Sequence, residues 1–354
     1  MPDGQSKNSR LNIMFKEFKK ELIFEPNKYF QSCHASTVTI LGNGDIMAAW
    51  FAGSAEGADD VAIWSSRRQN GIWSIPQKLA DDMGQPNWNP VLYTADNGNV
   101  MLFYKVGRNI SEWYTKVIIS EDNGATWSQP EELVKGDLSG GRGPVRCKVI
   151  KLSNGNILAP TSTEKGAWKC MSDIYDTVSN TWTKSNEIMI EDLDYKNIER
   201  VKSDIAVSEQ SFKGRGIIQP TLWESEPNVV HMMTRSSEGK VYRSDSYDGG
   251  KTWGKAYATS LPNNNSGIDV TRLEDGTLVL VYNPVGINWG PRTPIILSAS
   301  HDNGITWGEN ITLDEGEGEY SYPAIVTKNN EIFITYTFDR KSIAFWNIKL
   351  RNYI

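Results

Sequence analysis

The sequence predicts an all-β fold, a six-bladed β-propeller of four-stranded antiparallel blades, and two repeats indicate it. The first is an eight-residue turn, S-x-D-x-G-x-T-W, which occurs three times, starting at Ser120, Ser246 and Ser300. A turn that recurs so closely indicates a recurrent unit of fold.

The second repeat is a Gly or Asn turn followed by a strand of alternating apolar residues, which is typical of a β-hairpin. An interval of about 55 residues accommodates four short strands with their turns, which is one propeller blade. The pattern occurs six times, at intervals of 48 to 73 residues, and its turn residues are Gly44, Gly98, Gly155, Asn228, Gly276 and Asn330. Six units therefore predict six blades.

Each residue type in the first repeat has a structural use. The Asp and Ser side chains can bond to backbone amides inside the turn, Gly supplies backbone freedom, and Trp packs between neighbouring sheets. We therefore interpret Asp122, Asp248 and Asp302 as structural residues. Less regular versions of the turn end at Trp73 and Trp182.

No stretch of the chain is typical of a linker, so we expect one propeller domain over residues 1–354. Residues 1 to about 24 are expected to form an N-terminal extension and a ring-closing strand. Helical periodicity of useful length is confined to the stretch around FKEFKKEL, and the apolar residues near Leu22 to Phe24 are expected to pair with the last blade. The longest interval indicates an insertion near residues 189–204.

Composition excludes several classes of function. A net charge of −6 argues against a general nucleic-acid or anionic-membrane surface. No apolar run is long enough to span a membrane, and the N-terminus lacks the apolar core of a signal peptide. Three cysteines fit a reducing compartment, so we predict a cytoplasmic protein, or a secreted one if an export signal has been removed. Three scattered His and no C-x-x-C predict neither a metal site nor a cofactor.

The innermost strands of a propeller line its central channel, so their polar residues are candidates for a site. Six polar residues at equivalent positions indicate one site at one mouth of the channel. They lie nine or ten residues before each hairpin turn: His34, Asn89, Arg146, Gln219, Ser266 and Tyr320.

The loops that follow the hairpin strands provide a second set of candidates. The clustered Arg residues predict an anionic partner, because the guanidinium fork matches a carboxylate. Flat aromatic side chains beside polar groups suit the face of a sugar ring, so the predicted ligand is a small oligosaccharide or glycan with an acidic sugar. The loop candidates are Glu56, Asp59, Asp60, Lys105, Arg108, Glu164, Arg235, Asn283, Asn288 and Arg292, with Trp88, Trp223 and Trp289 nearby.

The turns and the blade number together resemble the sialidase superfamily, in its divergent bacterial-type BNR/Asp-box branch, whose Asp-box is S-x-D-x-G-x-x-W. The resemblance covers essentially the whole chain. It implies a tyrosine nucleophile, which matches Tyr320, and an aspartate acid/base, which matches Asp59 or Asp60. It also implies that Arg235 and Arg292 are the second and third arginines of a carboxylate clamp.

The chain departs from this pattern at two positions. His34 stands where the first arginine should open blade one, and Gln219 stands where the glutamate helper of the tyrosine should lie. The clamp then has two arginines unless Arg146 or Lys148 joins it. The remaining substrate-binding candidates are Asn89, Trp88, Glu164, Asn264, Trp289 and Tyr322, the last as an alternative to Tyr320.

Three functions remain open at this point. The first is an exo-acting, retaining glycoside hydrolase that releases a terminal sialic-acid-like or uronic sugar, with His34 as the base for the tyrosine. The second is a uronate lyase in which His34 and the tyrosine act as base and acid. The third is a glycan-binding propeller without catalytic activity.

Overall fold

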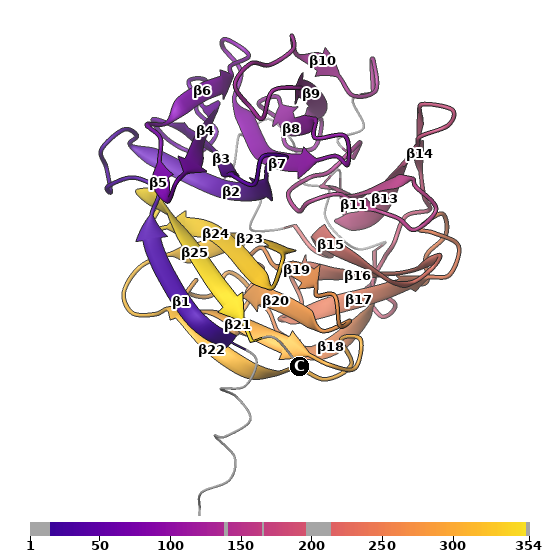
Figure 1. Cartoon of the computed structure of the whole chain (residues 1–354). Helices are drawn as coiled ribbons and strands as arrows, with labels where there is room; N and C mark the ends of the chain where they lie inside the picture. The colour runs from indigo at the N-terminus through magenta and orange to yellow at the C-terminus, as the bar shows by residue number, and fades with distance from the viewer. Residues whose placement is uncertain (1–14, 138–140, 165, 196–213, 352–354) are drawn as a thin grey trace, which may run out of the picture.

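The computed structural model describes residues 15–137, 141–164, 166–195 and 214–351, and these residues form 25 strands. The strands assemble into six antiparallel sheets that surround a central axis like the blades of a propeller (Figure 1). The predicted fold class is confirmed. Within the described residues, no helix is long and apolar enough to cross a membrane.

The first three blades each run outward from the axis in chain order. Blade one consists of β2 (Ser32–Ile40), β3 (Ile46–Gly53), β4 (Ala62–Gln69), β5 (Ile72–Trp73) and β6 (Gln77–Ala80). Its outer edge is split, because β5 and β6 both pair with β4. Blade two consists of β7 (Asn87–Thr94), β8 (Val100–Val106), β9 (Tyr114–Ser120) and β10 (Glu131–Glu132). Blade three consists of β11 (Ile150–Lys151), β12 (Ile157–Thr163), β13 (Lys169–Asp176) and β14 (Thr181–Lys184).

The last three blades complete the ring. Blade four consists of β15 (Ile217–Glu226), β16 (Val229–Ser236), β17 (Lys240–Ser246) and β18 (Tyr257–Pro262). Blade five consists of β19 (Asp269–Arg272), β20 (Leu278–Tyr282), β21 (Ile295–Ser300) and β22 (Gly308–Asp314). Blade six consists of β23 (Tyr320–Lys328), β24 (Glu331–Phe338), β25 (Ser342–Leu350) and the N-terminal β1 (Phe15–Leu22).

The N-terminal segment closes the ring as a strand. β1 pairs antiparallel with β25, with Phe15 opposite Leu350 and Leu22 opposite Ala344 (Figure 1). The helical periodicity seen around FKEFKKEL is therefore overridden by the hydrogen-bonding edge of the last blade. The predicted boundaries of the single domain stay a prediction, and most of the predicted insertion near residues 189–204 lies outside the described residues.

The hydrophobic core is divided among the blade interfaces. Six clusters of buried apolar residues occur in the described chain, one between each pair of neighbouring blades. The cluster between blades one and two, for example, joins Met47 and Phe51 to Leu92 and Leu102. Because each sheet is buried on both faces, a blade cannot be stable without its neighbours.

The three Asp-box turns have the structural role that the sequence predicts. In blade five, Asp302 Oδ1 accepts hydrogen bonds from Ser300 Oγ at 2.8 Å and Thr306 N at 2.9 Å, and Oδ2 accepts from Thr306 Oγ1. Asp122 and Asp248 accept the same set of bonds in blades two and four. The three Trp side chains of these turns pack into the cluster shared with the preceding blade: Trp127, Trp253 and Trp307.

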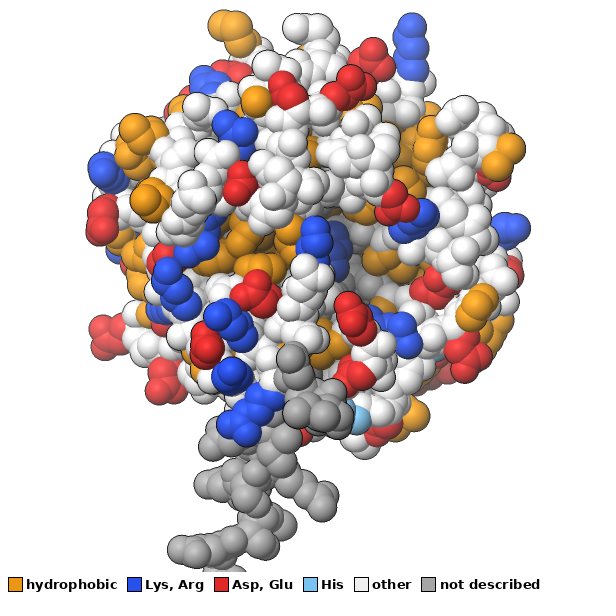
Figure 2. Space-filling view, viewed as in Figure 1, with side chains coloured by type: hydrophobic (Ala, Val, Ile, Leu, Met, Phe, Trp, Pro, Cys, Tyr) orange, Lys and Arg blue, Asp and Glu red, His pale blue; other side chains and the backbone are white. Residues whose placement is uncertain are grey.

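The surface seen in Figure 2 mixes the two signs of charge. Lys and Arg side chains lie among Asp and Glu side chains over this face, without a broad patch of one sign. Such a surface has no extended basic footprint of the kind that a nucleic acid needs.

Candidate active site

Four inner strands share one irregularity near the same mouth of the propeller. In β2, β7, β15 and β23 the pairing register shifts, as in a β-bulge, and one residue inside the shift has a positive φ: Ala35 (54°), Asn89 (42°), Gln219 (51°) and Tyr322 (56°). Positive φ is a costly conformation for a residue other than glycine, and such residues cluster at functional sites. Pro follows three of the four, and because it has no N–H group it cannot continue the strand ladder. The bulges thus turn selected side chains toward the axis.

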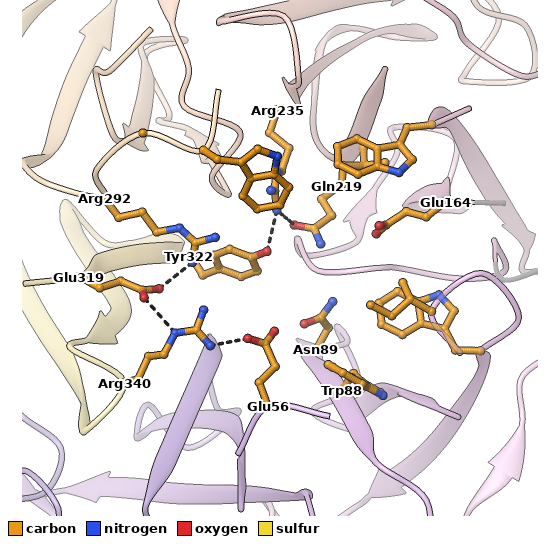
Figure 3. A pocket seen from close by; sticks show the side chains of 16 residues that line it. Glu56, Trp88, Asn89, Glu164, Gln219, Arg235, Arg292, Glu319, Tyr322 and Arg340 are labelled. Carbon is orange, nitrogen blue, oxygen red and sulfur yellow. Dashed lines mark hydrogen bonds and ion pairs between the residues drawn. The ribbon is translucent and has the colours of Figure 1, made fainter. Parts of the chain in front are cut away.

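A pocket of about 380 Å³ lies where three of these bulges converge, and all six blades contribute to it. One side is charged and the other is mainly aromatic (Figure 3). The lining residues are Glu56, Trp88, Asn89, Ile110, Trp113, Glu164, Trp168, Ile218, Gln219, Arg235, Trp289, Gly290, Arg292, Glu319, Tyr322 and Arg340.

Tyr322 stands at the centre of the charged side. Its hydroxyl oxygen accepts a hydrogen bond of 2.6 Å from Nη1 of Arg235 (Figure 3). The guanidinium carbons of Arg292, Arg146 and Arg235 lie 5.2, 5.4 and 5.5 Å from the centre of its ring. Three cationic side chains therefore surround one phenol ring at this side of the pocket.

Arg235 is held rigidly in the pocket wall. Its Nε donates to Asn265 Oδ1 at 3.0 Å, and its Nη1 also donates to Gln219 Oε1 at 3.1 Å. Burial lowers the pKa of Arg235, but a guanidinium remains charged in proteins. A buried cation with a fixed orientation is suited to bind an anionic group.

Two further arginines share one carboxylate. The carboxylate of Glu319 accepts a hydrogen bond of 2.6 Å from Nη1 of Arg292 and one of 2.9 Å from Nε of Arg340 (Figure 3). Arg340 also donates a hydrogen bond to Glu56. Burial raises the pKa of Glu319, but the surrounding positive charges, with Arg292 first and Arg340 also contributing, together outweigh burial, so that the pKa lies well below its usual value. Glu319 is therefore a permanent anion that orients two guanidinium groups.

Glu164 differs from the other pocket carboxyls. It directly follows β12 and faces the pocket beside Trp168. Burial raises the pKa of Glu164 to about 7, against the opposing charge of Arg235. Within the described ranges, no three His, Cys, Asp or Glu side chains are grouped in a way that could hold a metal ion.

The family model for the BNR repeat-like domain matches residues 44–334. The chain belongs to this family. No curated protein matches it in sequence.

Solved structures with a similar propeller extend the comparison of this BNR repeat-like chain. A Hadza microbial sialidase, Hz136, aligns over 93% of this chain and 68% of its own, with 16% identity and a TM-score of 0.74. A Dyadobacter fermentans protein of unknown function aligns over 94% of this chain and 99% of its own, with 16% identity and a TM-score of 0.73. The Trypanosoma rangeli sialidase aligns over 94% of this chain and 60% of its own, with 14% identity and a TM-score of 0.68. At these identities the likeness is one of fold.

The structure brings about half of the residues predicted from the sequence of this BNR repeat-like chain into one pocket. Trp88 lies on its aromatic side, and Arg235 and Arg292 lie on its charged side (Figure 3). The guanidinium carbon of Arg235 lies 5.8 Å from the ring centre of Trp289. The predicted residues that line the pocket are Glu56, Trp88, Asn89, Glu164, Gln219, Arg235, Trp289, Arg292 and Tyr322.

Tyr320 does not line the pocket. Its ring packs 5.3 Å from that of Phe338, centre to centre, and its hydroxyl donates to the carbonyl oxygen of Glu317 at 3.4 Å. The bulge residue of blade six is Tyr322. Counting back ten residues from Asn330 gave Tyr320, because Tyr322 lies only eight residues before this turn. The X-Pro pair shared with Asn89 and Gln219 identifies Tyr322.

Asp59 and Asp60 lie outside the pocket, in the loop between β3 and β4. Asp59 is 55% exposed and pairs with Arg108, at 2.7 Å to Nη2. The hydrogen bonds from Arg108 lower the pKa of Asp59. Asp60 caps the start of the loop, accepting 3.0 Å from Ser54 N and 2.8 Å from Ser54 Oγ. The residue of this loop that reaches the pocket is Glu56.

His34 is enclosed behind Tyr322, with their ring centres 4.2 Å apart. It is 1% exposed, and its Nδ1 lies 2.9 Å from Thr337 Oγ1. Burial, together with the charges of Arg340 and other arginines, lowers the pKa of His34 well below its usual value. The ring of His34 therefore packs against Tyr322 and is not part of the pocket lining.

Arg146 and Lys148 do not line the pocket, and they tie the blades together. Arg146 donates to the carbonyl oxygens of Pro323 and Ile268. Lys148 lies 3.0 Å from both carboxylate oxygens of Asp269. The partners of these two cations belong to blades five and six, so the cations act as staples across the axis.

Asn264 acts on the loop that carries two pocket residues. Its side-chain Nδ2 donates a hydrogen bond to the backbone carbonyl oxygen of Pro291 at 2.8 Å, and its backbone carbonyl oxygen accepts one from Trp289 N. It thus positions the segment from Trp289 to Arg292.

Sequence reasoning missed several lining residues, and one of them carried a usable signal. Arg340 lies in the β24–β25 turn of blade six, the counterpart of the loops that supplied Glu56 and Arg292 in blades one and five. Including the corresponding loop of the last blade among the candidate loops would have identified Arg340. The apolar lining had no such signal, because apolar and Trp residues are also abundant in the blade interfaces. The missed apolar residues are Ile110, Trp113, Trp168 and Ile218.

Proposed function

We propose that this protein is an exo-acting, retaining glycoside hydrolase that releases a terminal acidic sugar, with Tyr322 as its nucleophile. The observation that carries the proposal is the phenol oxygen of Tyr322, which faces the pocket and accepts 2.6 Å from a buried guanidinium. Sialidases with a similar propeller support the class of reaction, and the Trypanosoma rangeli sialidase is known in complex with sialic acid.

Three guanidinium groups support recognition of a carboxylate. Arg235, Arg292 and Arg340 all border the pocket. The resemblance to sialidases places one arginine at the start of blade one, where this chain has His34. The backbone carbonyl of Arg340 accepts 2.9 Å from Cys33 N, directly beside that position. We propose that Arg340 supplies the third guanidinium from the neighbouring blade.

The size and the walls of the pocket support an exo-acting enzyme. A volume of about 380 Å³ suits one sugar unit with part of a second rather than a long polymer. Trp88, Trp113, Trp168 and Trp289 offer apolar faces to a ligand in the pocket. Such surfaces suit the C–H face of a sugar or an apolar substituent on it.

Hydrolysis through Tyr322 takes place in two displacements at one carbon. The phenolate oxygen bonds to the anomeric carbon while the glycosidic C–O bond breaks, and water later breaks the tyrosine–sugar bond. Two inversions retain the configuration of the sugar. Arg235 stabilises the phenolate, and the guanidinium clamp holds the sugar in line with it.

The geometry favours hydrolysis over the lyase reaction. The lyase hypothesis requires His34 as a base, but that ring is 1% exposed and its pKa is lowered well below its usual value by burial. No histidine lines the pocket among the described residues.

A product assay tests this proposal. The protein is incubated with α-linked sialosides and with uronide disaccharides, and the products are followed by mass spectrometry and by ultraviolet absorbance. We expect products that have gained one water, without the absorbance of a new conjugated double bond. New absorbance without added water means a lyase, and tight binding without any product means a glycan-binding propeller; either result contradicts the proposal.

A further inference from the structure

We infer that Glu164 is the general acid and base of this reaction, protonating the leaving oxygen and later accepting a proton from water. The inference rests on the proposed function and assigns a role that Asp59 and Asp60, both outside the pocket, do not fill.

Glu164 is placed to act on the leaving group. It follows the last residue of β12 in blade three and projects into the pocket across from Tyr322 of blade six (Figure 3). A sugar bound between them would present its anomeric carbon to Tyr322 and its glycosidic oxygen to Glu164. A nucleophile and a proton donor on opposite sides of the scissile bond are the arrangement that glycoside hydrolysis requires.

The other two pocket carboxyls are already engaged. Glu319 is paired with both Arg292 and Arg340, and Glu56 is paired with Arg340. Among the residues that the structure describes, no hydrogen-bond donor or ion-pair partner contacts the carboxyl of Glu164. It is the one acid of the described lining that is free to exchange a proton with a ligand.

The surroundings of Glu164 keep its proton exchangeable near neutral pH. Burial raises its pKa to about 7. Arg235, which reaches in from β16, opposes this effect. The remaining charged groups lie on the other side of the pocket: Glu56, Arg292, Glu319 and Arg340. Carboxyls whose environments separate their pKa values take different roles, and the one near 7 is suited to both donate and accept a proton.

The two steps balance with Glu164 alone. In the first, Tyr322 phenolate bonds to the anomeric carbon, the glycosidic bond breaks, and the proton of Glu164 passes to the leaving oxygen. In the second, water bonds to the anomeric carbon, Glu164 carboxylate takes its proton, and Tyr322 leaves as phenolate. The net change is the addition of one water.

Leaving-group dependence tests the inference. Glu164→Gln is compared with wild type on a glycoside with a sugar leaving group and on an aryl glycoside with a strongly acidic phenol. We expect a loss of about 10² to 10⁴-fold in kcat/KM on the first, because protonation is then essential. The loss in the first step on the aryl glycoside should be much smaller, and the alkaline limb of the wild-type pH profile should disappear.

Asp59→Asn is the matched control, since Asp59 is an exposed acid in a neighbouring loop, and it should keep both rates and the pH limb. Carbon-13 NMR of labelled glutamate should show a carboxyl that titrates near pH 7 in wild type and is missing in folded Glu164→Gln. If wild type hydrolyses no glycoside, the proposed function fails and this inference with it. If wild type is active and Glu164→Gln keeps the same rates and the same alkaline limb, only the inference is overturned.

Discussion

The three repeated Asp residues of the Asp-box turns and the three Glu residues of the pocket have opposite kinds of environment. Asp122, Asp248 and Asp302 occupy one environment three times, with the same Ser, Thr and backbone donors. In the pocket, each acid has a different environment. One is locked between two arginines, one is paired with a single arginine, and one has no partner in the described chain. The repeated environments stabilise the fold, whereas the different environments in the pocket give its three acids different chemical properties.

The inner-strand bulges show both principles at once. The backbone repeats, with φ between 42° and 56° at all four bulges, while the side chains change from blade to blade. Ala35 leaves room, Asn89 and Gln219 supply amides, and Tyr322 supplies a phenol. The costly positive φ at these positions is explained by the pocket, because three of the four bulge residues line it.

The largest effect should separate two tyrosines that are two residues apart. Tyr322→Phe removes the nucleophile, and we expect kcat to fall by about 10⁴-fold or more. Tyr320→Phe removes only a hydroxyl bonded to a carbonyl oxygen and should leave kcat within about twofold. Steady-state kinetics of both variants decides this. Equal losses in the two would break the distinction between the bulge and its flanking strand.

An intermediate effect should come from the guanidinium that is supplied by blade six. Arg340→Gln removes a charged donor, so KM for an acidic sugar should rise by about 10 to 100-fold. A substrate whose carboxylate has been converted to an amide should lose less. Arg108→Gln removes an exposed arginine outside the pocket and should leave KM unchanged for both substrates. If KM rises equally in Arg340→Gln and Arg108→Gln, the effect comes from the net charge of the protein and not from a contact of Arg340 with the carboxylate.

The smallest effect should be structural and independent of catalysis. Hydrogen bonds from Thr306 lower the pKa of Asp302 to about 2, against about 3.9 in an unfolded chain. The carboxylate therefore stabilises the fold above about pH 4, and this contribution is lost as the pH falls through about 2. Asp302→Asn should lower Tm by roughly 2 °C at neutral pH with unchanged kcat.

The same variant and wild type should melt alike at the acid end of this range. A Tm difference that persists there, measured by circular dichroism, would mean that Asp302 acts through its shape and not through its charge.

The sequence alone carries the fold because the fold is repetitive. Six hairpin signals and three identical turns fixed the blade number, and only the short N-terminal strand was obscured by its helical periodicity. The ring-closing edge that overrides this periodicity comes from β25, more than 300 residues away.

The site was predictable only where it follows the repeat. Asn89 and Gln219 were found by counting from the hairpin turns, whereas in blade six the same count gave Tyr320 and the bulge residue is Tyr322. The environment of an acidic residue could not be predicted from the sequence, because no neighbouring residue in the sequence distinguishes Glu164 from Asp59. Only in the folded chain does Glu164 line the pocket and Asp59 pair with Arg108. Burial and partners are properties of the fold.

The most direct test of the account is to trap the covalent intermediate. A glycosyl fluoride of a carboxylated sugar, with a second fluorine beside the anomeric carbon, slows the hydrolysis of a glycosyl-enzyme more than its formation. Intact-mass and peptide mass spectrometry should then find one sugar bound to the peptide that contains Tyr322. Turnover of ordinary substrates with no adduct, or an adduct on another residue, would contradict the account.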